Sequence, residues 1–369
     1  MKTQQIDSIY WDSIRTLLKP VLPLIEDETV SEILINGSRN TYYEKNGNLH
    51  LSEILFEERT LKVLVRNLAQ YVGRNLYETT HQLEARFPDG SRVQAVMPPI
   101  SRSGICIAIR KFSRRLLSLK DLVEKGAITK NAASWLKIMV KMRKNIIISG
   151  GTSSGKTTLL NILGGLISEK NRIVVLEDSA ELQIKHPDMV AMESRATTDE
   201  AKNKKVDIRE LVRVSLRLRP DRIIVGEVRG AEALDMLQAM TTGHAGSMST
   251  VHANDSRTAL MRLETLSTYG TSGEIPLATI RSQVASTVEV IVQMNRFWDG
   301  SRNITSISEV MPLDINGEYK QKVLFKYRIR KRERDGKVHG SLQPTGEVSS
   351  FVDQLPFFGI ELDKDFFQK

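Results

Sequence analysis

The stretch Gly150-Gly-Thr-Ser-Ser-Gly-Lys-Thr157 carries the clearest structural signal in the chain. It satisfies every fixed position of the pattern G-x-x-x-x-G-K-[ST], in which glycines let backbone N–H groups curl around phosphate oxygens. The apolar run KNIIIS (144–149) precedes it and TTLLNIL (157–163) follows it, so it joins a predicted buried strand to a predicted helix. The alternative is a Gly/Ser-rich loop that matches the pattern by chance, but such a loop need not lie between a buried strand and a helix. The stretch therefore predicts a phosphate-binding P-loop.

We expect this loop to bind the phosphates of ATP. The helix that begins near Lys156 would direct the positive end of its dipole at them. The Lys156 ammonium would neutralise charge at the β and γ phosphates, and the Thr157 hydroxyl is the predicted ligand of Mg²⁺. The predicted ATP-binding residues of the loop are Gly150, Gly151, Thr152, Ser153, Ser154, Gly155, Lys156, Thr157 and Thr158.

A carboxylate follows a second predicted strand. The segment RPDRIIVGEVRG (219–230) places Glu227 at a strand end, where ligand-facing residues of open α/β sheets lie. A carboxylate there can orient or deprotonate the attacking water, although a glutamate in a surface ion pair would leave the same pattern. Gly226 stands where many P-loop enzymes have a magnesium-binding aspartate. Any acidic contact to Mg²⁺ must therefore come through water or from elsewhere.

The segment RIVVLEDSAELQ (172–183) offers three further carboxylates, those of Glu177, Asp178 and Glu181. We place its strand between the strands of the loop and of Glu227. From there, one or more of these carboxylates could reach the γ-phosphate side. Asp178 could instead cap a helix.

The segment TTGHAGSMSTVHANDS (241–256) contains two histidines, His244 and His252. Neither a cysteine nor a third histidine stands nearby, which argues against a zinc site. We expect these imidazoles to sense the nucleotide or to relay a subunit contact, and assign His244 to nucleotide binding and His252 to the catalytic set. A hydrogen-bonded buried histidine is the alternative for His244.

The chain of 369 residues is long enough for two domains. Up to residue 112, strand-like stretches alternate with helical ones around turns at Asn36-Gly37, Asn46-Gly47 and Asp89-Gly90, which predicts a smaller α+β domain. In it, residues 9–25 form a predicted helix ended by Pro20 and Pro23, and residues 57–73 another. Residues 113–130 are a predicted hinge or connector. From 131 to 369, strands alternate with helices, which predicts a mostly parallel sheet covered on both faces.

Composition narrows the class of protein. Cys106 is the only cysteine, which excludes an intrachain disulfide and a cysteine metal site. Neither an apolar run of about 18 residues nor a secretory signal is present, and with ATP as ligand we expect a cytoplasmic protein. The net charge of +9 fits nucleic acid, anionic lipid, an acidic partner or a solvated surface.

The four segments GGTSSGKTT, RIVVLEDSAELQ, RPDRIIVGEVRG and TGHAGSMSTVHANDS resemble, in order, the Walker A, acidic, Walker B and histidine boxes of the type II and type IV secretion ATPases. The segments at 22–49, 86–101, 104–112 and 118–129 resemble the CpaF-like branch, which powers tight-adherence (Flp/Tad) pili and has conjugative-transfer ATPases as relatives. The resemblance extends from about Val21 to Arg302. The chain departs from it in Ser153-Ser154, in a short N-terminus and in the absence of a tetracysteine insert.

The resemblance implies a RecA-like P-loop ATPase domain after the N-terminal domain, and a homohexamer. It implies a catalytic carboxylate at Glu227, assisted by Glu177 or Glu181 in the catalytic set, and phosphate contacts from Arg92 and Arg110. Arg217 and Arg219 are candidates for a contact across a subunit interface. The partner would be an inner-membrane platform protein, on whose cytoplasmic side the hexamer docks and drives pilus assembly or secretion. The cargo stays open between pilin, an effector and DNA.

Two other classes of protein fit parts of the sequence. A nucleic-acid motor would explain the positive charge and the run KYRIRKRER (326–334), but aromatic residues, which such motors use for base stacking, make up only 6% of the chain. A nucleotide-binding regulator with little turnover would explain the loop, but not Glu227. We expect an ATPase that does not bind nucleic acid.

Overall fold

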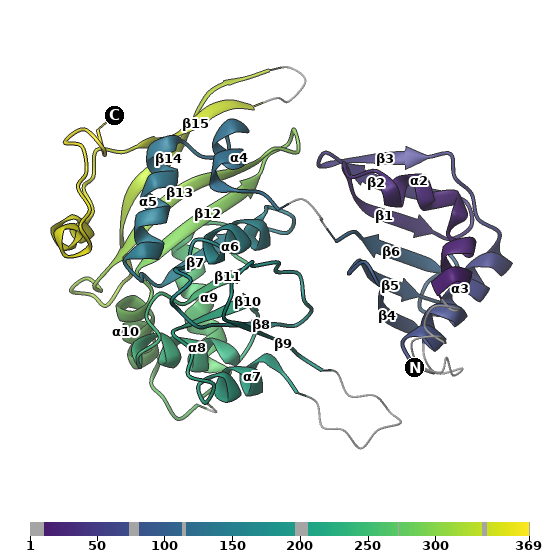
Figure 1. Cartoon of the computed structure of the whole chain (residues 1–369), viewed down its shortest axis with the longest axis horizontal. Helices are drawn as coiled ribbons and strands as arrows, with labels where there is room; N and C mark the ends of the chain where they lie inside the picture. Colours follow the sequence, from purple (N-terminus) through teal and green to yellow (C-terminus); the bar gives the residue numbers. More distant parts are fainter. Residues whose placement is uncertain are drawn as a thin grey trace. The chain divides into compact units, whose positions relative to one another are not determined.

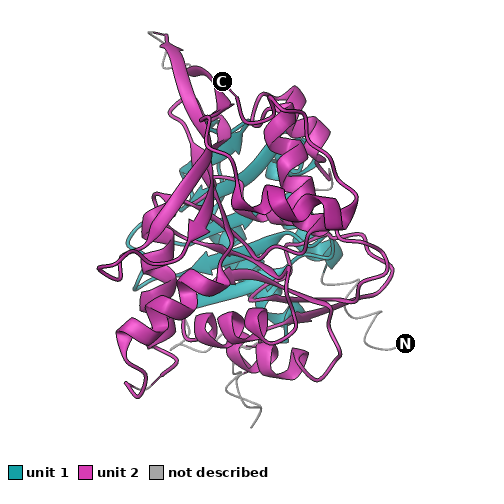
Figure 2. Cartoon of the chain, turned by 90° about the vertical axis from the view of Figure 1, so that its left-hand side faces the viewer, with its two compact units in different colours: residues 1–115 teal, residues 116–369 magenta. Residues whose placement is uncertain are grey.

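The computed structural model describes residues 11–73, 81–112, 116–195, 206–271, 273–333 and 338–368. The chain divides into two compact units, residues 1–115 and residues 116–369 (Figure 2). Residues 113–115, which open the predicted connector, lie outside the described residues. In the described parts, no helix combines the length and the apolar character that crossing a bilayer requires.

A six-stranded antiparallel sheet forms the N-terminal unit (Figure 1). Its order is β3-β2-β1-β6-β5-β4. Alternate strand residues such as Ile33 and Ile107 pack with Leu64 of helix α3 in one core. The bounds are β1 (Val30–Asn36), β2 (Asn40–Lys45), β3 (Asn48–Ser52), α3 (Glu58–Tyr71), β4 (Gln82–Arg86), β5 (Arg92–Val96) and β6 (Cys106–Arg110). The predicted Asn46-Gly47 turn is confirmed, because both residues have a positive φ and β2 pairs with β3 across them.

The predicted role of Pro20 is confirmed, because the helical residues 11–17 end before it, but the predicted role of Pro23 is wrong. Pro20 lies in the first turn of η1 (Lys19–Val21), and Pro23 lies in the first turn of α2 (Leu22–Glu26). A proline in a first turn removes an N–H that has no partner within the helix, so each proline also suits the start of the next helical segment.

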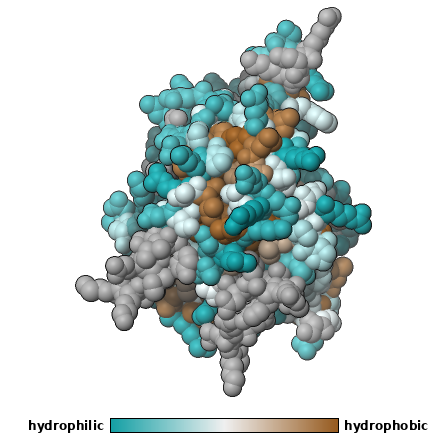
Figure 3. Space-filling view, turned by 90° about the vertical axis from the view of Figure 1, so that its right-hand side faces the viewer, coloured by the Kyte–Doolittle hydropathy of each residue, from teal (hydrophilic) through white to brown (hydrophobic). Residues whose placement is uncertain are grey.

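The outer strand β3 exposes apolar side chains. Leu49 and Leu51, two residues apart on the strand, and the nearby Leu55 are all largely exposed. Figure 3 shows apolar surface among the hydrophilic side chains of one face of the molecule. The edge of a sheet also presents unpaired N–H and C=O groups, so β3 combines both features of a contact surface.

The C-terminal unit contains a nine-stranded sheet in the order β15-β14-β13-β12-β7-β11-β10-β8-β9. The six strands from β12 to β9 are parallel, and β13, β14 and β15 extend the sheet as antiparallel strands (Figure 1). The predicted α/β class and mostly parallel sheet are therefore confirmed. The bounds are β7 (Ile146–Gly150), β8 (Ile173–Glu177), β9 (Met189–Glu193), β10 (Arg222–Val228), β11 (Met248–Val251), β12 (Val290–Arg296), β13 (Arg302–Met311), β14 (Lys320–Arg332) and β15 (Val338–Pro344).

Apolar residues on both faces of the parallel strands build two cores. On β7, Ile146 and Ile148 belong to one core and Ile147 to the other, because successive side chains of a strand point to opposite faces. The first core includes α4 (Leu119–Glu124), α5 (Lys130–Lys141), α6 (Lys156–Gly164) and residues of η2 (Ser350–Phe358). The second includes α7 (Ile208–Ser215), α8 (Glu232–Thr241), α9 (Ser256–Thr268) and α10 (Leu277–Thr287).

The predicted position of the acidic-segment strand is wrong. Strand β8 lies outside β10, and the strand between those of the loop and of Glu227 is β11. The order differs because the short run Met248–Val251, inside the histidine-rich segment, is itself a central strand that pairs with both β7 and β10.

Candidate functional site

The glycine-rich loop joins the carboxyl end of β7 to the first residue of α6, Lys156. Ser153 and Gly155 have φ angles of 55° and 97°, and this left-handed backbone makes the tight turn before the helix. A Cβ atom on Gly150 would lie 2.5 Å from the carbonyl oxygen of Met294 on β12. Close contact with β12 therefore requires glycine at 150, and backbone conformation favours it at 155.

The Lys156 side chain is only 7% exposed and lies inside the loop. Its ammonium donates a hydrogen bond to the Gly151 carbonyl at 2.8 Å, and lies 3.4 Å from Nε2 of His252. The Thr152 hydroxyl lies 3.2 Å from the same ring nitrogen. A buried ammonium at the amino end of a helix makes the loop a strongly positive site.

Glu227 lies beside the loop at the end of β10, and both of its carboxylate oxygens have partners. Oε1 accepts from Nδ1 of His252, and Oε2 accepts from Nε of Arg229 at 2.8 Å. Burial alone would raise the pKa of Glu227, but the hydrogen bonds from His252 and Arg229 outweigh it and hold the pKa below its ordinary value. Glu227 is therefore an ionised carboxylate at neutral pH.

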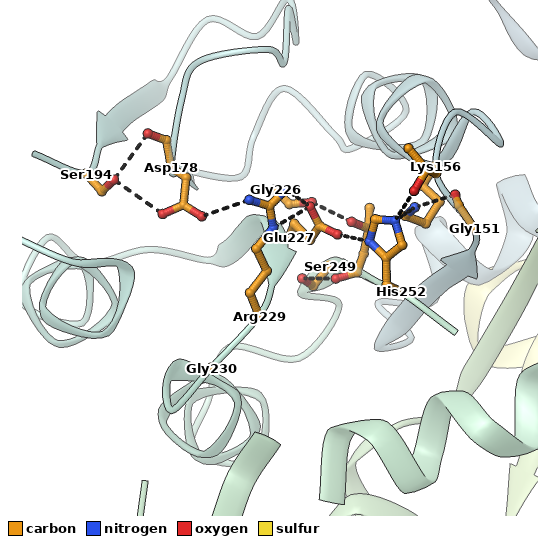
Figure 4. A network of polar contacts seen from close by, with 12 residues as sticks. Gly151, Lys156, Asp178, Ser194, Gly226, Glu227, Arg229, Gly230, Ser249 and His252 are labelled. Atoms are coloured by element: carbon orange, nitrogen blue, oxygen red, sulfur yellow. Dashed lines mark hydrogen bonds and ion pairs between the residues drawn. The ribbon is translucent and has the colours of Figure 1, made fainter. Parts of the chain in front are cut away.

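Polar contacts connect the loop to the acidic segment in one line (Figure 4). From Lys156 they pass through His252, Glu227 and Arg229, whose guanidinium lies 3.9 Å from Asp178. With the ring proton of His252 on Nδ1, that nitrogen donates to Glu227 and Nε2 accepts from Lys156 or Thr152. This tautomer satisfies every contact of the imidazole.

The sequence analysis missed Arg229 and the residue that positions it. The Glu232 carboxylate accepts the backbone N–H groups of Arg229 and Gly230 at 2.6 and 2.7 Å, and so fixes the turn after β10. The only sequence signal for Arg229 was its position two residues after Glu227. Residues two apart in an extended chain point to the same face, so the two side chains could meet.

Glu177 has a different environment from Glu227. It is 5% exposed, and its Oε1 accepts the backbone N–H groups of Glu181 and Leu182 at 2.9 Å each. Burial raises the pKa of Glu177, against the opposing effect of those two hydrogen bonds. A Cβ atom on Gly226 would lie 3.0 Å from Cγ of Glu177, so this side chain fills the space beside the glycine.

Asp178 does not cap a helix, because residues 178–188 form a loop and strand β9 follows. Its carboxylate contacts Ser194 and Arg229 instead. The predicted role of Glu181 stays a prediction; its described contribution is the backbone N–H that holds Glu177.

Five predicted residues are not brought to the loop: three lie elsewhere in the C-terminal unit, and two belong to the N-terminal unit. His244 precedes β11, with Nδ1 3.1 Å from the Ala239 carbonyl, whereas the loop lies at the carboxyl ends of the strands. Arg217 and Arg219 precede β10, at the same amino-terminal edge. Arg92 belongs to the N-terminal unit, as does Arg110; the two are register partners on β5 and β6, which places them on one face of that sheet.

A pocket of about 270 Å³ opens beside the loop. One wall is Gly151, and the others come from the segment after β11 and from helix α9. The lining residues are Gly151, His252, Ala253, Asn254, Thr258 and Arg262.

The open, mostly parallel sheet, with a glycine-rich loop between a buried strand and its helix, defines an α/β domain with a candidate phosphate-binding loop. Residues 16–309 match the model of the type II/IV secretion system protein family. The chain belongs to that family.

Proteins of three organisms show the relationship in more detail. A Mycobacterium tuberculosis protein named for conjugal transfer is 35% identical over 293 residues, 78% of this chain and 82% of its own length. The conjugal transfer protein TrbB of Rhizobium radiobacter is 33% identical, with 75% and 83% covered. The type IV secretion system protein PtlH of Bordetella pertussis is 32% identical, with 76% and 89% covered.

Solved structures confirm the fold. The pilus retraction motor PilT with bound ADP has a TM-score of 0.55 at 19% identity, with 82% of this chain and 84% of PilT covered. The ATPase DotB of Legionella pneumophila has a TM-score of 0.52 at 20% identity, with 80% of each chain covered.

Proposed function

We propose that this chain is a Mg²⁺-dependent ATPase, the motor of a type IV secretion or Flp/Tad-type pilus assembly system. The observation that supports it best is the continuous line of contacts from Lys156 in the loop to Glu227 at the end of β10. A phosphate-binding loop needs Lys156, whereas hydrolysis also needs a carboxylate that faces the terminal phosphate. Membership of the type II/IV secretion system protein family supports a role in secretion. The relatives named for type IV secretion and conjugal transfer support the same role.

The loop would bind the phosphates through backbone N–H groups of residues 150–158 and the Lys156 ammonium. Lys156 would exchange the Gly151 carbonyl for phosphate oxygens, which are stronger acceptors because they are charged. That movement would also change its contact with His252. We therefore assign His252 the role of reporting the state of the loop to Glu227.

The residues beside the loop fit Mg²⁺. Thr157 offers a hydroxyl in the first turn of α6, and Glu227 and Glu177 place carboxylates at the ends of β10 and β8, which are the oxygen donors this ion prefers. The ion would neutralise charge on the β and γ phosphates. Glu177, which fills the space beside Gly226, would act through water where other P-loop proteins have an aspartate.

Glu227 would orient the water that attacks the γ-phosphorus. Its lowered pKa makes it a weak base, so positioning the water suits it better than removing a proton early in the reaction. Because both of its oxygens already have partners, one contact must be exchanged for the water. The contact to Arg229 suits this, since the Arg229 side chain is 63% exposed and can turn into solvent.

In the proposed assembly, six chains form a ring on the cytoplasmic side of an inner-membrane platform protein. Arg92 and Arg110 would contact nucleotide phosphates, and Arg217, Arg219 and His244 would act at a subunit contact. The exposed apolar edge of β3 supports association with another chain. Hydrolysis would move the N-terminal domain (1–112) against the ATPase domain (131–369) about the predicted connector (113–130), whose residues from 116 on pack with the C-terminal unit.

The relatives also favour a second cargo. Two of the three described above are named for conjugal transfer, so DNA transfer is the alternative to a pilin or an effector. Strand β14 also supports DNA as the cargo, because it carries seven cationic residues from Lys320 to Arg332 that could contact phosphates. Filter binding of single-stranded DNA over a salt series separates the two: a steep salt slope with DNA-stimulated hydrolysis favours the DNA motor.

The ATPase proposal is tested with Lys156→Ala. We expect phosphate release from ATP and Mg²⁺ to fall by at least about 100-fold, because phosphate charge at the loop loses its neutralising partner. Lys144→Ala, at a neighbouring lysine that pairs with Glu289 outside the loop, controls for loss of a buried ammonium. Equal rates for the Lys156 variant and the wild type would contradict the site assignment.

A further inference from the structure

Arg262 on helix α9 is exposed and lines the pocket beside the loop. The neighbouring arginines are engaged: Arg257 pairs with Glu318 at 3.2 Å, and Arg281 pairs with Glu264 at 2.9 Å. Arg262, by contrast, has no hydrogen bond or ion pair to any residue that the structure describes. A pocket with an uncompensated guanidinium on one wall attracts an anion.

The other walls of the pocket are held in place. Nε2 of the buried Gln293 donates to the carbonyls of Ala253 and Asn254 at 3.3 and 3.0 Å, which fixes the segment after His252. The Asp255 and Thr258 side chains close a capping box at the start of α9. Thr258 and Arg262 are four residues apart, so they share one face of the helix. The anion donors therefore project from a rigid frame.

The position of the pocket indicates which anion it takes. Gly151 and His252 line the pocket and also take part in the polar contacts around Lys156. The pocket therefore adjoins the glycine-rich loop on the side of Glu227. In hydrolysis, the water oxygen bonds to the γ-phosphorus while the bond to the bridging oxygen breaks. Orthophosphate that leaves ADP toward Glu227 would enter this pocket.

We propose that the pocket is a binding site for inorganic phosphate, in which Arg262 and the Asn254 side-chain amide hold the product as it leaves the loop. The proposal rests on the proposed ATPase function. Guanidinium and amide groups donate to phosphate oxygens, and the forked guanidinium makes two bonds at once. The Thr258 hydroxyl is occupied within the capping box and forms a wall of the pocket.

The test compares Arg262→Gln with Arg257→Gln, which replaces another exposed arginine five residues earlier on the same helix. ATPase rates are measured at increasing concentrations of added inorganic phosphate at constant ionic strength. We expect Arg262→Gln to raise the inhibition constant for phosphate about tenfold, equivalent to roughly 1.4 kcal/mol, and to leave KM for ATP within about twofold. Arg257→Gln should change neither value.

Calorimetric titration with inorganic phosphate separates this proposal from the ATPase proposal, because it needs no turnover. Phosphate binding that is lost in Arg262→Gln and kept in Arg257→Gln supports the pocket even for a chain that does not hydrolyse ATP. The same phosphate affinity in the wild type and both variants overturns it. An active wild type whose inhibition by phosphate is unchanged in Arg262→Gln overturns it as well.

Discussion

At the scale of single residues, the loop tolerates a change at one position and not at another. Ser153 has a φ of 55°, which costs a residue with a Cβ about 1 kcal/mol, so Ser153→Gly removes strain. Gly150→Ala instead places a methyl group against the Met294 carbonyl. We expect Gly150→Ala to lower stability by about 1–3 kcal/mol and Ser153→Gly to keep wild-type ATPase activity. Thermal unfolding and phosphate release check both, and wild-type behaviour of Gly150→Ala would contradict the packing argument.

Arg229 should control how the activity depends on pH. Burial raises the pKa of Glu227, and the hydrogen bonds from His252 and Arg229 more than reverse this. Arg229→Gln removes one of the lowering contacts, so the pKa of Glu227 rises and the carboxylate becomes protonated at a higher pH. We expect the acid limb of the kcat/KM profile to move to higher pH. Arg257→Gln is the control, and an acid limb that stays in place rules out Glu227 as the group that titrates.

At the scale of secondary-structure elements, the capping box of α9 supports the segment that carries His252. The Asp255 side chain accepts the backbone N–H of Thr258 at 2.8 Å. Asp255→Ala leaves that N–H without its acceptor, and we expect a loss of about 1 kcal/mol, seen as a melting temperature lower by roughly 2–4 °C. Asp255→Asn keeps an acceptor and should unfold near the wild-type temperature. Equal losses in the two variants would show that the charge matters, and not the cap.

The elements also show where sequence reasoning succeeds. The loop between β7 and α6 was predictable, because its glycines and flanking apolar runs are local features. The position of β11 was not, because four residues inside a polar segment become a central strand only through pairing with β7 and β10. The same limit applies to Glu177, whose carboxylate accepts backbone N–H groups of the loop that follows it. The sequence indicates that a carboxylate lies near the site, but not which groups it bonds.

At the scale of the whole molecule, the arginines of the N-terminal unit test whether hydrolysis depends on both units. Arg92 and Arg110 lie side by side in register on one face of the sheet. If they contact phosphates, the double substitution with glutamine should lower kcat/KM for ATP by at least about tenfold, since each charge-assisted hydrogen bond contributes about 1.5–3 kcal/mol. Arg59→Gln, on helix α3, is the control. Wild-type kinetics of the double variant would confine the site to the C-terminal unit.

Trp298, which follows strand β12, should report the state of the glycine-rich loop through its fluorescence. Met294 is the register partner of Gly150 and contacts it closely, so a shift of the loop displaces the strand. Two residues beyond the strand stands Trp298, 86% exposed, with the Arg332 guanidinium 5.9 Å from its ring. Intrinsic tryptophan fluorescence should therefore respond when ligand fills the loop, without any dye. Trp298→Phe would remove that signal and leave the emission of the other two tryptophans.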